Sequence, residues 1–347
     1  MRVRIKDVAA LAGVSTFTVS VVLNDVEGAR VAASTRKRVE AAAVELGYAP
    51  NHLARGLRTQ RTHTIGMLSD QVVTTPYAGR MILGAQQAAW EAGYLLLLVS
   101  TDGDVRMEAE AIRELKARQV DGLLYATMYH QLLELPAGLS TSSTVVLDAD
   151  VVDGSVPHVV PDDERGGYEA TRELLRHGHT RIAYLANAHD VPANQLRLAG
   201  YRRALAEAGI TFDPTLVIAE AALSAGGERA AAALLSRRHR PTAIFVFNDR
   251  MAVGVFRAAR RAGLSVPDDI SIVGYDDQEL VASDTDPGLT TMALPHLAMG
   301  QWAANRLIAM INSSDPSIDG HTEPRKHLEP CPLVVRGSVG PPPRNEP

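Results

Sequence analysis

The N-terminal part of the chain places apolar residues at helical spacing in two short segments that are separated by a glycine. Apolar side chains three and four residues apart line one face of an α-helix. Gly13 can adopt the left-handed backbone of a tight turn between two helices, and Ser15 is a favourable N-cap for the second helix. The pattern therefore predicts two short helices joined by a turn. Their apolar faces consist of Ile5, Val8, Ala9 and Ala12 in the first helix and Val19, Val22 and Leu23 in the second.

A third helix is predicted over residues 33–46, where Gly47 ends an apolar face. Three helices with this turn fit a helix-turn-helix, whose second helix enters the major groove of DNA. Pairs of short helices around a glycine also occur in other all-α domains, so the spacing alone leaves DNA binding open. Pro50 marks the end of this head, and residues 59–62 form a polar link.

Beyond residue 63, short apolar runs alternate with amphipathic segments. Buried strands that alternate with helices indicate parallel sheets with right-handed crossovers. These units exceed what one sheet holds comfortably, so the predicted fold class is α/β, with a helical head and a two-lobed body of doubly wound parallel sheets. Strands are predicted at 64–68, 94–99, 122–126, 144–147, 158–160, 182–186, 243–247 and 270–274, and helices at 81–92, 108–118, 169–176, 197–208, 227–236 and 251–262.

Charge divides the chain at the same place. The whole chain has a formal charge of −5, with 35 Lys and Arg against 40 Asp and Glu. Residues 1–61 hold ten Lys and Arg against five acids, and the remaining residues hold 25 against 35. A basic head on an acidic body directs a polyanion to the head. Charge clusters are often only solvated surfaces, but this one coincides with the predicted helix-turn-helix.

The remaining composition narrows the class of protein. Hydrophobic residues make up 46% of the 347 residues, which fits a globular protein. The single cysteine, Cys331, rules out an intramolecular disulfide and fits a reducing compartment. No apolar run approaches the roughly 18 residues of a membrane helix, and no apolar signal segment precedes the first helix. We therefore expect a cytoplasmic protein, and no motif calls for a cofactor or a metal ion.

A series of different short motifs extends in order along nearly the whole chain. In the head they are Asp7-Val8-Ala9, Ala12-Gly13-Val14-Ser15, Thr18-Val19-Ser20, Leu23-Asn24, Thr35 with Arg38-Val39, Leu46-Gly47-Tyr48 with Pro50-Asn51, and Ala54-Arg55 with Leu57. In the body they include Ile65-Gly66, Gly93-Tyr94, Asp121-Gly122, Gly178-His179, Gly200-Tyr201, Asn248-Asp249, Val273-Gly274-Tyr275-Asp276-Asp277 and Arg336-Gly337-Ser338. Taken together, they resemble the lactose/purine repressor family of bacterial transcription regulators.

The resemblance implies a body with the fold of periplasmic sugar-binding proteins and a ligand in the cleft between its lobes. It also implies three crossings between the lobes, near residues 161–163, 290–293 and 326–329. The tail shows no leucine heptad of the kind that makes some relatives tetrameric, so a homodimer is expected. The predicted domains are a head over 1–50, a hinge and linker over 51–61, a first lobe over 62–161 with about 292–326, a second lobe over 162–291 with about 327–340, and a tail over 341–347.

By resemblance, the solvent side of the second helix meets base edges in the operator. Many members carry an arginine at the position of Val21, and valine cannot make the bidentate bond to guanine that arginine makes. Val21 and Phe17 are four residues apart and fit thymine methyl groups, or they pack against another part of the head. The head residues expected to contact DNA are Thr16, Phe17, Ser20, Val21 and Asn24.

Residues 51–57 resemble the family's hinge helix, which lies in the minor groove and inserts a leucine between base steps. Leu57 is the expected wedge, and Ala54 and Arg55 are the neighbouring DNA contacts. Gly56 costs a helix interior roughly 1 kcal/mol, which fits a segment that folds only on DNA but also weakens the assignment of a helix. The alternative is an ordinary surface leucine in a linker.

Short acids and amides cluster where the predicted strands of the body end. Ligands of doubly wound lobes bind at these ends, and such side chains hydrogen-bond the vicinal hydroxyl groups of a sugar or nucleoside. An aspartate there also often caps the next helix, which applies to Asp148, Asp249 and Asp277. The expected effector contacts are Asp102, from its place after a predicted strand, and five residues that the resemblance implies: Tyr77, Asp148, Arg197, Asn248 and Asp276. Many sugar-binding members place an aromatic ring near 220–222, where this chain has alanines, so the ligand's identity is open.

Two other classes share parts of this pattern. Carboxylates facing a cleft also occur in glycosidases, but phosphate loops and nucleophile-elbow motifs are absent. An exported solute-binding protein has such a body without a DNA-binding head. We therefore predict a ligand-responsive homodimeric transcription regulator, most simply a repressor, and not an enzyme. Its expected partners are a pseudo-palindromic DNA operator and a small polar effector, a sugar or a nucleobase-like compound, and the sign of the response is open.

Overall fold

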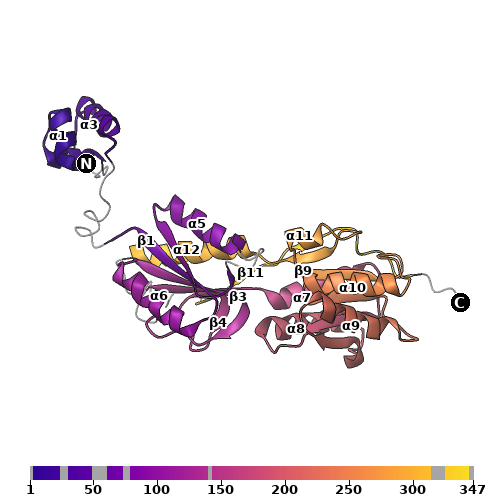
Figure 1. The fold of residues 1–347 in the computed structure, drawn as a ribbon. Coiled ribbons are helices and arrows are strands. Elements are labelled where there is room, and N and C mark those ends of the chain that lie inside the picture. The colour runs from indigo at the N-terminus through magenta and orange to yellow at the C-terminus, as the bar shows by residue number, and fades with distance from the viewer. Residues whose placement is uncertain are drawn as a thin grey trace. The chain divides into compact units, whose positions relative to one another are not determined.

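The computed structural model describes residues 3–23, 30–48, 61–72, 79–139, 143–313 and 325–343 (Figure 1). The chain forms two units, Met1–Thr62 and His63–Pro347, which we call the head and the body. The body carries two parallel sheets, each with helices on both faces, so the predicted α/β fold class is confirmed.

The head is a bundle of three helices, α1 (Ile5–Ala12), α2 (Thr16–Leu23) and α3 (Ala33–Leu46). Gly13 has a left-handed backbone with φ 65°, as the turn requires. Ser15 Oγ accepts a hydrogen bond from the Thr18 amide at 3.1 Å, so it caps α2 as predicted. All three predicted helices are confirmed. Their buried core consists of Val8, Ala9, Ala12, Val19, Val22, Val39, Ala42 and Ala43.

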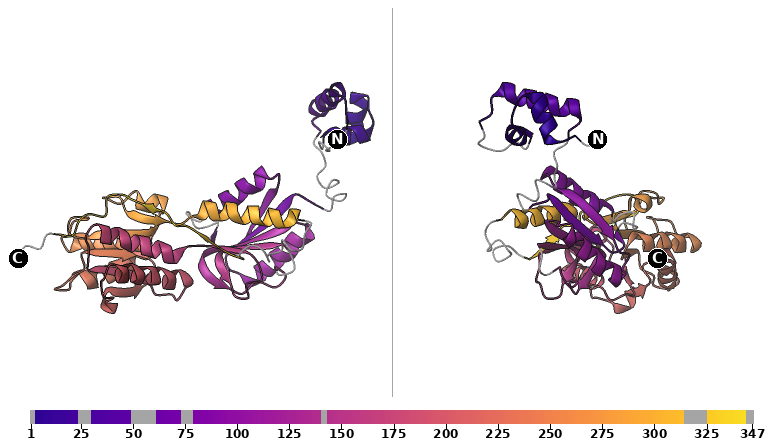
Figure 2. Two further views of the ribbon diagram at one scale, coloured as in Figure 1. Left: turned by 180° about the vertical axis from the view of Figure 1, so that it is seen from behind. Right: turned by 60° about the vertical axis from the view of Figure 1, so that its left-hand side comes forward.

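The first lobe of the body is a parallel sheet in the order β11-β5-β4-β3-β1-β2, with α5 and α12 on one face and α6 on the other (Figures 1 and 2). Its strands are β1 (Thr64–Ser69), β2 (Leu95–Ser100), β3 (Gly122–Leu133), β4 (Thr144–Val151), β5 (His158–Pro161) and β11 (Lys326–Glu329). Its helices are α5 (Gly79–Glu91), α6 (Val105–Ala117) and α12 (His296–Asn312).

The second lobe is a sheet in the order β12-β10-β9-β8-β6-β7, parallel except for the pairing of β12 with β10. Successive side chains of β8 alternate between two cores: Phe245 packs with α7 and α8, and Ile244 with α9 and α10. The strands are β6 (Ile182–Asn187), β7 (Val217–Glu220), β8 (Ala243–Val246), β9 (Ser271–Asp276), β10 (Thr290–Ala293) and β12 (Leu333–Val334). The helices are α7 (Asp163–Arg176), α8 (Pro192–Glu207), α9 (Ser224–Leu235), α10 (Asp249–Arg261), the short α11 (Glu279–Ala282) and the 3₁₀ turn η2 (Pro214–Leu216).

The chain changes sheet three times within the body. It passes from β5 to α7, from β10 to α12, and from β11 to β12. The third change follows Glu329, at the end of the region near residues 326–329 where the resemblance placed it. Lys326 pairs with His158, so that β11 still extends the first sheet.

Several elements begin earlier than the sequence pattern indicated, or were missed. α7 starts at Asp163 and was predicted from residue 169, because Gly166 and Gly167 have low helix propensity. β3 continues to Leu133 after a break in its pairing with β4, although the predicted strand ended at residue 126. The elements absent from the prediction are β7, β10, β11, β12, α11 and α12.

Among the described residues, no single helix is long and apolar enough to cross a membrane. Only the pair α1 and α2 meets the length and composition together, and these two helices of the head are bent by 101°.

Three pairs of neighbouring helices, α5 with α12, α7 with α8 and α9 with α10, pack with backbone against backbone. A Cβ atom added to Gly200 of α8 would lie 2.0 Å from the carbonyl oxygen of Glu164 in α7. Glycine is therefore required at this crossing, which sets how close α8 lies to α7. Similarly close approaches occur at Gly84, Gly167, Gly227, Gly254 and Gly300.

We predict that Gly200→Ala lowers the thermal midpoint of the body by several degrees. The added methyl group must push α8 off α7, and overpacking of this kind costs about 1–3 kcal/mol or more. Gly79→Ala is the matched control, because an added Cβ there meets nothing within 4 Å. Circular dichroism melting of both variants checks this, and equal midpoints for Gly200→Ala and the parent would contradict it.

Candidate functional site

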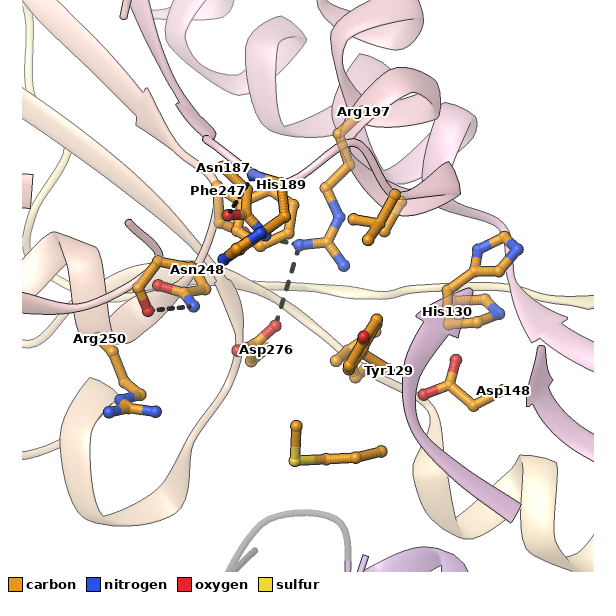
Figure 3. A pocket seen from close by; sticks show the side chains of 16 residues that line it. Tyr129, His130, Asp148, Asn187, His189, Arg197, Phe247, Asn248, Arg250 and Asp276 are labelled. Carbon is orange, nitrogen blue, oxygen red and sulfur yellow. Dashed lines mark hydrogen bonds and ion pairs between the residues drawn. The ribbon is translucent and has the colours of Figure 1, made fainter. Parts of the chain in front are cut away.

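A cavity of about 340 Å³ lies between the two lobes of the body, at the carboxyl ends of strands from both sheets. This is the position where doubly wound sheets bind ligands, and the volume is in the range of small-molecule sites. Figure 3 shows its side chains. The lining residues are Met128, Tyr129, His130, Asp148, Pro161, Asn187, His189, Val191, Ala193, Arg197, Ala222, Phe247, Asn248, Arg250, Asp276 and Leu294.

Arg197 enters the cavity wall from α8 and is only 4% exposed. Its Nε donates to Asp163 Oδ1 at 2.8 Å, and its Nη1 donates to the carbonyl oxygen of Phe247 at 2.6 Å. The guanidinium carbon lies 3.5 Å from the centre of the Tyr275 ring and 4.6 Å from that of Phe247. These contacts fix the guanidinium in one orientation, because a planar fork with ring faces and two acceptors has little freedom left.

Asp276 ends β9 and faces Arg197 across the cavity (Figure 3). Its Oδ1 lies 4.0 Å from Arg197 Nη1, and its Oδ2 accepts from Gln278 Nε2 at 2.9 Å. Burial raises the pKa of Asp276 to about 6, although the Arg197 charge opposes the rise. The Asp276 carboxyl group is therefore a strong hydrogen-bond acceptor whose burial costs free energy, and a further hydrogen-bond donor lowers that cost.

Asp148 approaches from the other lobe, on β4, with a left-handed backbone of φ 61°. The side chain is buried, and its Oδ1 has no hydrogen-bond partner among the described residues. Burial raises the pKa of Asp148 well above its ordinary value, although the charge of His130 opposes the rise. A buried acceptor without a donor costs free energy, so a ligand that brings a donor to this oxygen relieves that cost.

Asn248 lines the cavity but already has partners for its amide. Its Oδ1 accepts from the Met251 amide at 2.8 Å, which caps α10, and its Nδ2 donates to the Ala222 carbonyl at 3.2 Å. Its neighbour Asp249 is fully buried and accepts from Thr291 Oγ1 at 2.6 Å and from a backbone amide, so its contacts belong to the fold. The capping alternative considered for Asp249 is wrong, because Asn248 caps α10 and the Asp249 carboxylate bonds Thr291 and the Gln278 amide instead.

The structure brings together four of the six predicted effector residues: Asp148, Arg197, Asn248 and Asp276. Asp102 does not line the cavity. It follows β2, the edge strand, which β3 and β1 separate from β4, and its side chain is exposed. Tyr77 lies outside the described residues.

Sequence reasoning missed several cavity residues. His130 and Tyr129 lie in the part of β3 beyond the predicted end of that strand. Phe247 was placed inside a predicted strand, yet it lies past the end of β8 and lines the cavity. Among the described residues, no group of three or more His, Cys, Asp or Glu side chains is arranged to hold a metal ion.

In the head, the predicted DNA contacts differ in accessibility. Phe17 is 75% exposed, Thr16 is exposed and Ser20 is half-buried. Val21 is only 8% exposed, so the expectation that it lies on the solvent side of α2 is wrong for this structure. A side chain must be accessible to touch a base, and Val21 therefore leaves our set of proposed contacts. The remaining predicted contacts, Asn24, Ala54, Arg55 and Leu57, lie outside the described residues.

Comparison with known proteins places both units in one family. Residues 4–51 match the bacterial regulatory proteins of the lacI family, and residues 171–339 match the periplasmic binding protein-like domain. The ribose operon repressor of Escherichia coli (strain K12) is 40% identical over 336 residues, which are 96% of this chain and 99% of that protein.

Two solved structures are also similar. The lac repressor dimer bound to operator and the anti-inducer ONPF has a TM-score of 0.77 and 29% identity, and the match covers 98% of this chain and 100% of that one. A LacI family transcriptional regulator from Enterococcus faecium with bound ribose has a TM-score of 0.64 and 28% identity, and the match covers 80% and 99%.

The chain therefore belongs to the lacI family of bacterial regulatory proteins. It is a transcriptional repressor of this family with a helix-turn-helix head and a ligand-binding body, and it is not an enzyme. The family and class predicted from the motifs are confirmed.

We predict that Asp148→Asn stabilises the ligand-free protein at neutral pH. Because burial raises the pKa of Asp148, the folded state favours the protonated acid and loses stability as rising pH ionises it. Asparagine cannot ionise, so the gain is present at neutral pH and disappears at a pH below about 3.9, where aspartate is protonated in the unfolded chain too.

Urea unfolding of parent and variant across this pH range measures the gain. Asp153→Asn is the control, because Asp153 is exposed and Ser155 holds its pKa low, so its loss brings no gain. A variant less stable than the parent at neutral pH would contradict the prediction.

Proposed function

We propose that this repressor acts as a homodimer in the cytoplasm, binds a pseudo-palindromic operator through its two heads, and binds a neutral sugar in the cavity of the body. D-Ribose is the candidate effector. The E. coli relative is named as the ribose operon repressor, and the E. faecium neighbour contains bound ribose. The single observation that carries the proposal is the convergence of Asp148, Arg197 and Asp276 from both lobes on one buried cavity.

A neutral polyhydroxylated ligand suits the charges of this cavity. The guanidinium of Arg197 is already paired with Asp163, so it does not require an anionic ligand to balance its charge. Asp148 and Asp276 both offer carboxyl oxygens, which accept hydrogen bonds from hydroxyl groups. The ionised carboxylate of Asp276 also repels an anionic ligand. Phe247 adds an apolar ring to the wall, and sugars combine apolar faces with hydroxyl edges.

The exposed side of α2 is the proposed base-reading surface. Thr16 and Phe17 are exposed at the start of this helix, where recognition helices contact base edges. Phe17 is large and apolar, which suits the methyl group of thymine. We also propose that Asn24, Ala54, Arg55 and the wedge Leu57 contact the operator, on the strength of the sequence motifs alone.

We predict that Arg197→Ala and Asp276→Asn each weaken D-ribose binding about ten- to a hundredfold, since charge-assisted hydrogen bonds contribute roughly 1.5–3 kcal/mol each. Both variants keep non-specific DNA binding, because the head is unchanged. Arg203→Ala is the control on the same helix: it removes an exposed arginine that pairs with Glu164 outside the cavity. Isothermal titration calorimetry gives the affinities.

Normal ribose affinity in both variants would place the sugar elsewhere. If the parent itself binds a purine nucleobase and not ribose, the cavity is a ligand site but the proposed effector is wrong.

We predict that Phe17→Ala makes the free energy of binding to an operator, selected by the parent from random duplex DNA, less favourable by roughly 1–3 kcal/mol, the usual cost of losing recognition of one base pair. Non-specific affinity, which depends on phosphate contacts, stays near that of the parent and falls steeply with salt. Val44→Ala removes an equally exposed apolar side chain from α3 and serves as the control. Fluorescence anisotropy at several salt concentrations measures both quantities, and a Phe17→Ala variant that binds as the parent does would exclude base contact.

A further inference from the structure

A series of ion pairs runs from Arg197 at the cavity into the first lobe, and its other four members are not among the proposed effector contacts. Arg197 pairs with Asp163 at 2.8 Å, and the other oxygen of Asp163 lies 2.8 Å from His130 Nδ1. His130 Nε2 lies 3.1 Å from Asp150 Oδ2, and Asp150 Oδ1 lies 2.7 Å from Lys326 Nζ. The five residues come from α8, α7, β3, β4 and β11, so this series of ion pairs joins both lobes.

The geometry fixes the protonation state of His130. Both ring nitrogens face carboxylate oxygens, which accept hydrogen bonds and cannot donate them when ionised. A neutral imidazole has one N–H and would leave one contact without a proton. The ring therefore carries two N–H groups and a positive charge. Its side chain is 1% exposed, so this is a buried cation between two buried or half-buried anions.

The pKa shifts agree with this assignment. Burial lowers the pKa of His130, but hydrogen bonds to Asp150 and Asp163 outweigh it and raise the pKa to about 9. Burial raises the pKa of Asp163, but Arg197 and His130 outweigh it and hold this pKa below its usual value. His130, Asp163 and Arg197 are therefore all charged at neutral pH.

Asp163 has one oxygen for each cation. Oδ1 accepts from Arg197, and Oδ2 accepts from His130. Without His130, a fully buried carboxylate oxygen loses its donor, and the carboxylate turns to find another. Asp163 is also the first residue of α7 after the crossing from β5, so its position depends on both lobes.

We propose that His130 is a positioning residue: held as an imidazolium between Asp150 of the first lobe and Asp163 of the second, it orients Asp163, and through it the guanidinium of Arg197. The consequence for ligand affinity rests on the proposed sugar-binding function. His130 ties the lobes in the arrangement in which Arg197 and Asp148 line the same cavity.

Other charged groups near His130 must be controlled in any pH experiment. Asp148 of β4 raises the pKa of His130 through its charge. His158 of β5 lies 3.4 Å from Asp150 Oδ1, and Lys326 of β11 shares that oxygen. His158 is a matched control, because it is a buried histidine that contacts Asp150 and lies outside the pair formed by Asp163 and Arg197.

The first experiment needs no ligand. Nuclear magnetic resonance of the full chain, labelled at histidine and arginine, follows the His130 ring and the Arg197 Nε and Cζ signals from neutral pH upward. We expect a His130 midpoint at about pH 9 and a change in the Arg197 signals with the same midpoint. His130→Gln shifts the Arg197 signals at neutral pH, and His158→Gln leaves them in place.

The second experiment measures D-ribose affinity by calorimetry. In the parent, ribose affinity falls as the pH passes about 9, where His130 loses its charge. His130→Gln weakens binding by about tenfold or more at neutral pH, and its affinity does not fall further near pH 9. His158→Gln keeps both the affinity and the pH profile of the parent. The pH profile is the decisive readout, because a variant that is merely less stable lowers affinity without removing this titration.

A His130 midpoint near 6.5, the ordinary histidine value, or Arg197 signals that do not respond to His130 in parent or variant, would overturn the proposal. If His130→Gln does not fold, the titration of the parent still decides. If the parent shows the expected titration but binds no ribose, the positioning role is supported and only the proposed effector is wrong.

Discussion

The buried ion pair between Arg197 and Asp163 is the contact on which the rest of the body depends. A guanidinium taken out of water is costly unless its donors are paired, and an unpaired buried charge costs several kcal/mol. The fold meets this requirement from several directions at once: Asp163 starts α7, Phe247 offers its carbonyl oxygen, and the ring of Tyr275 lies 3.5 Å away. The glycine contact between α7 and α8 brings the two partners within reach.

That ion pair also explains why the cavity is poised for a ligand. Once Arg197 is satisfied by Asp163, the acceptors Asp148 and Asp276 remain as buried carboxyl groups whose pKa values are raised by burial. The ligand-free body thus carries a cost that a hydroxyl-rich molecule removes. Binding sites commonly hold such destabilising groups, and the surrounding fold compensates for them.

The sequence predicted the parts of the structure that local rules control. The three head helices follow from apolar spacing, the left-handed Gly13 and the Ser15 cap, all of which act within a few residues. Arg197 and Asp276 were found because the motifs of the family reach them. Residues whose role depends on distant partners escaped: Asp163 appeared only as part of a crossing, and His130 lies past a break in β3.

The predictions for Asp102 and Val21 failed for the same kind of reason, because both depend on contacts between distant parts of the chain. Asp102 does follow a strand, but the strand order, which single-sequence patterns do not give, places β2 at the edge of the sheet. Val21 is on the polar side of its helix by spacing alone, yet it is buried in the folded head. Burial is a property of the whole unit, and helical spacing only approximates it.

The proposed function treats the sugar as an effector, so its central claim is that ligand binding in the body changes the affinity of the head for its operator. The most direct test measures operator affinity with and without saturating D-ribose, and ribose affinity with and without operator, in one buffer. Coupling requires that both affinities change by the same factor, whatever its sign. Our account predicts equal factors clearly different from one. Ribose binding that leaves operator affinity unchanged would contradict it.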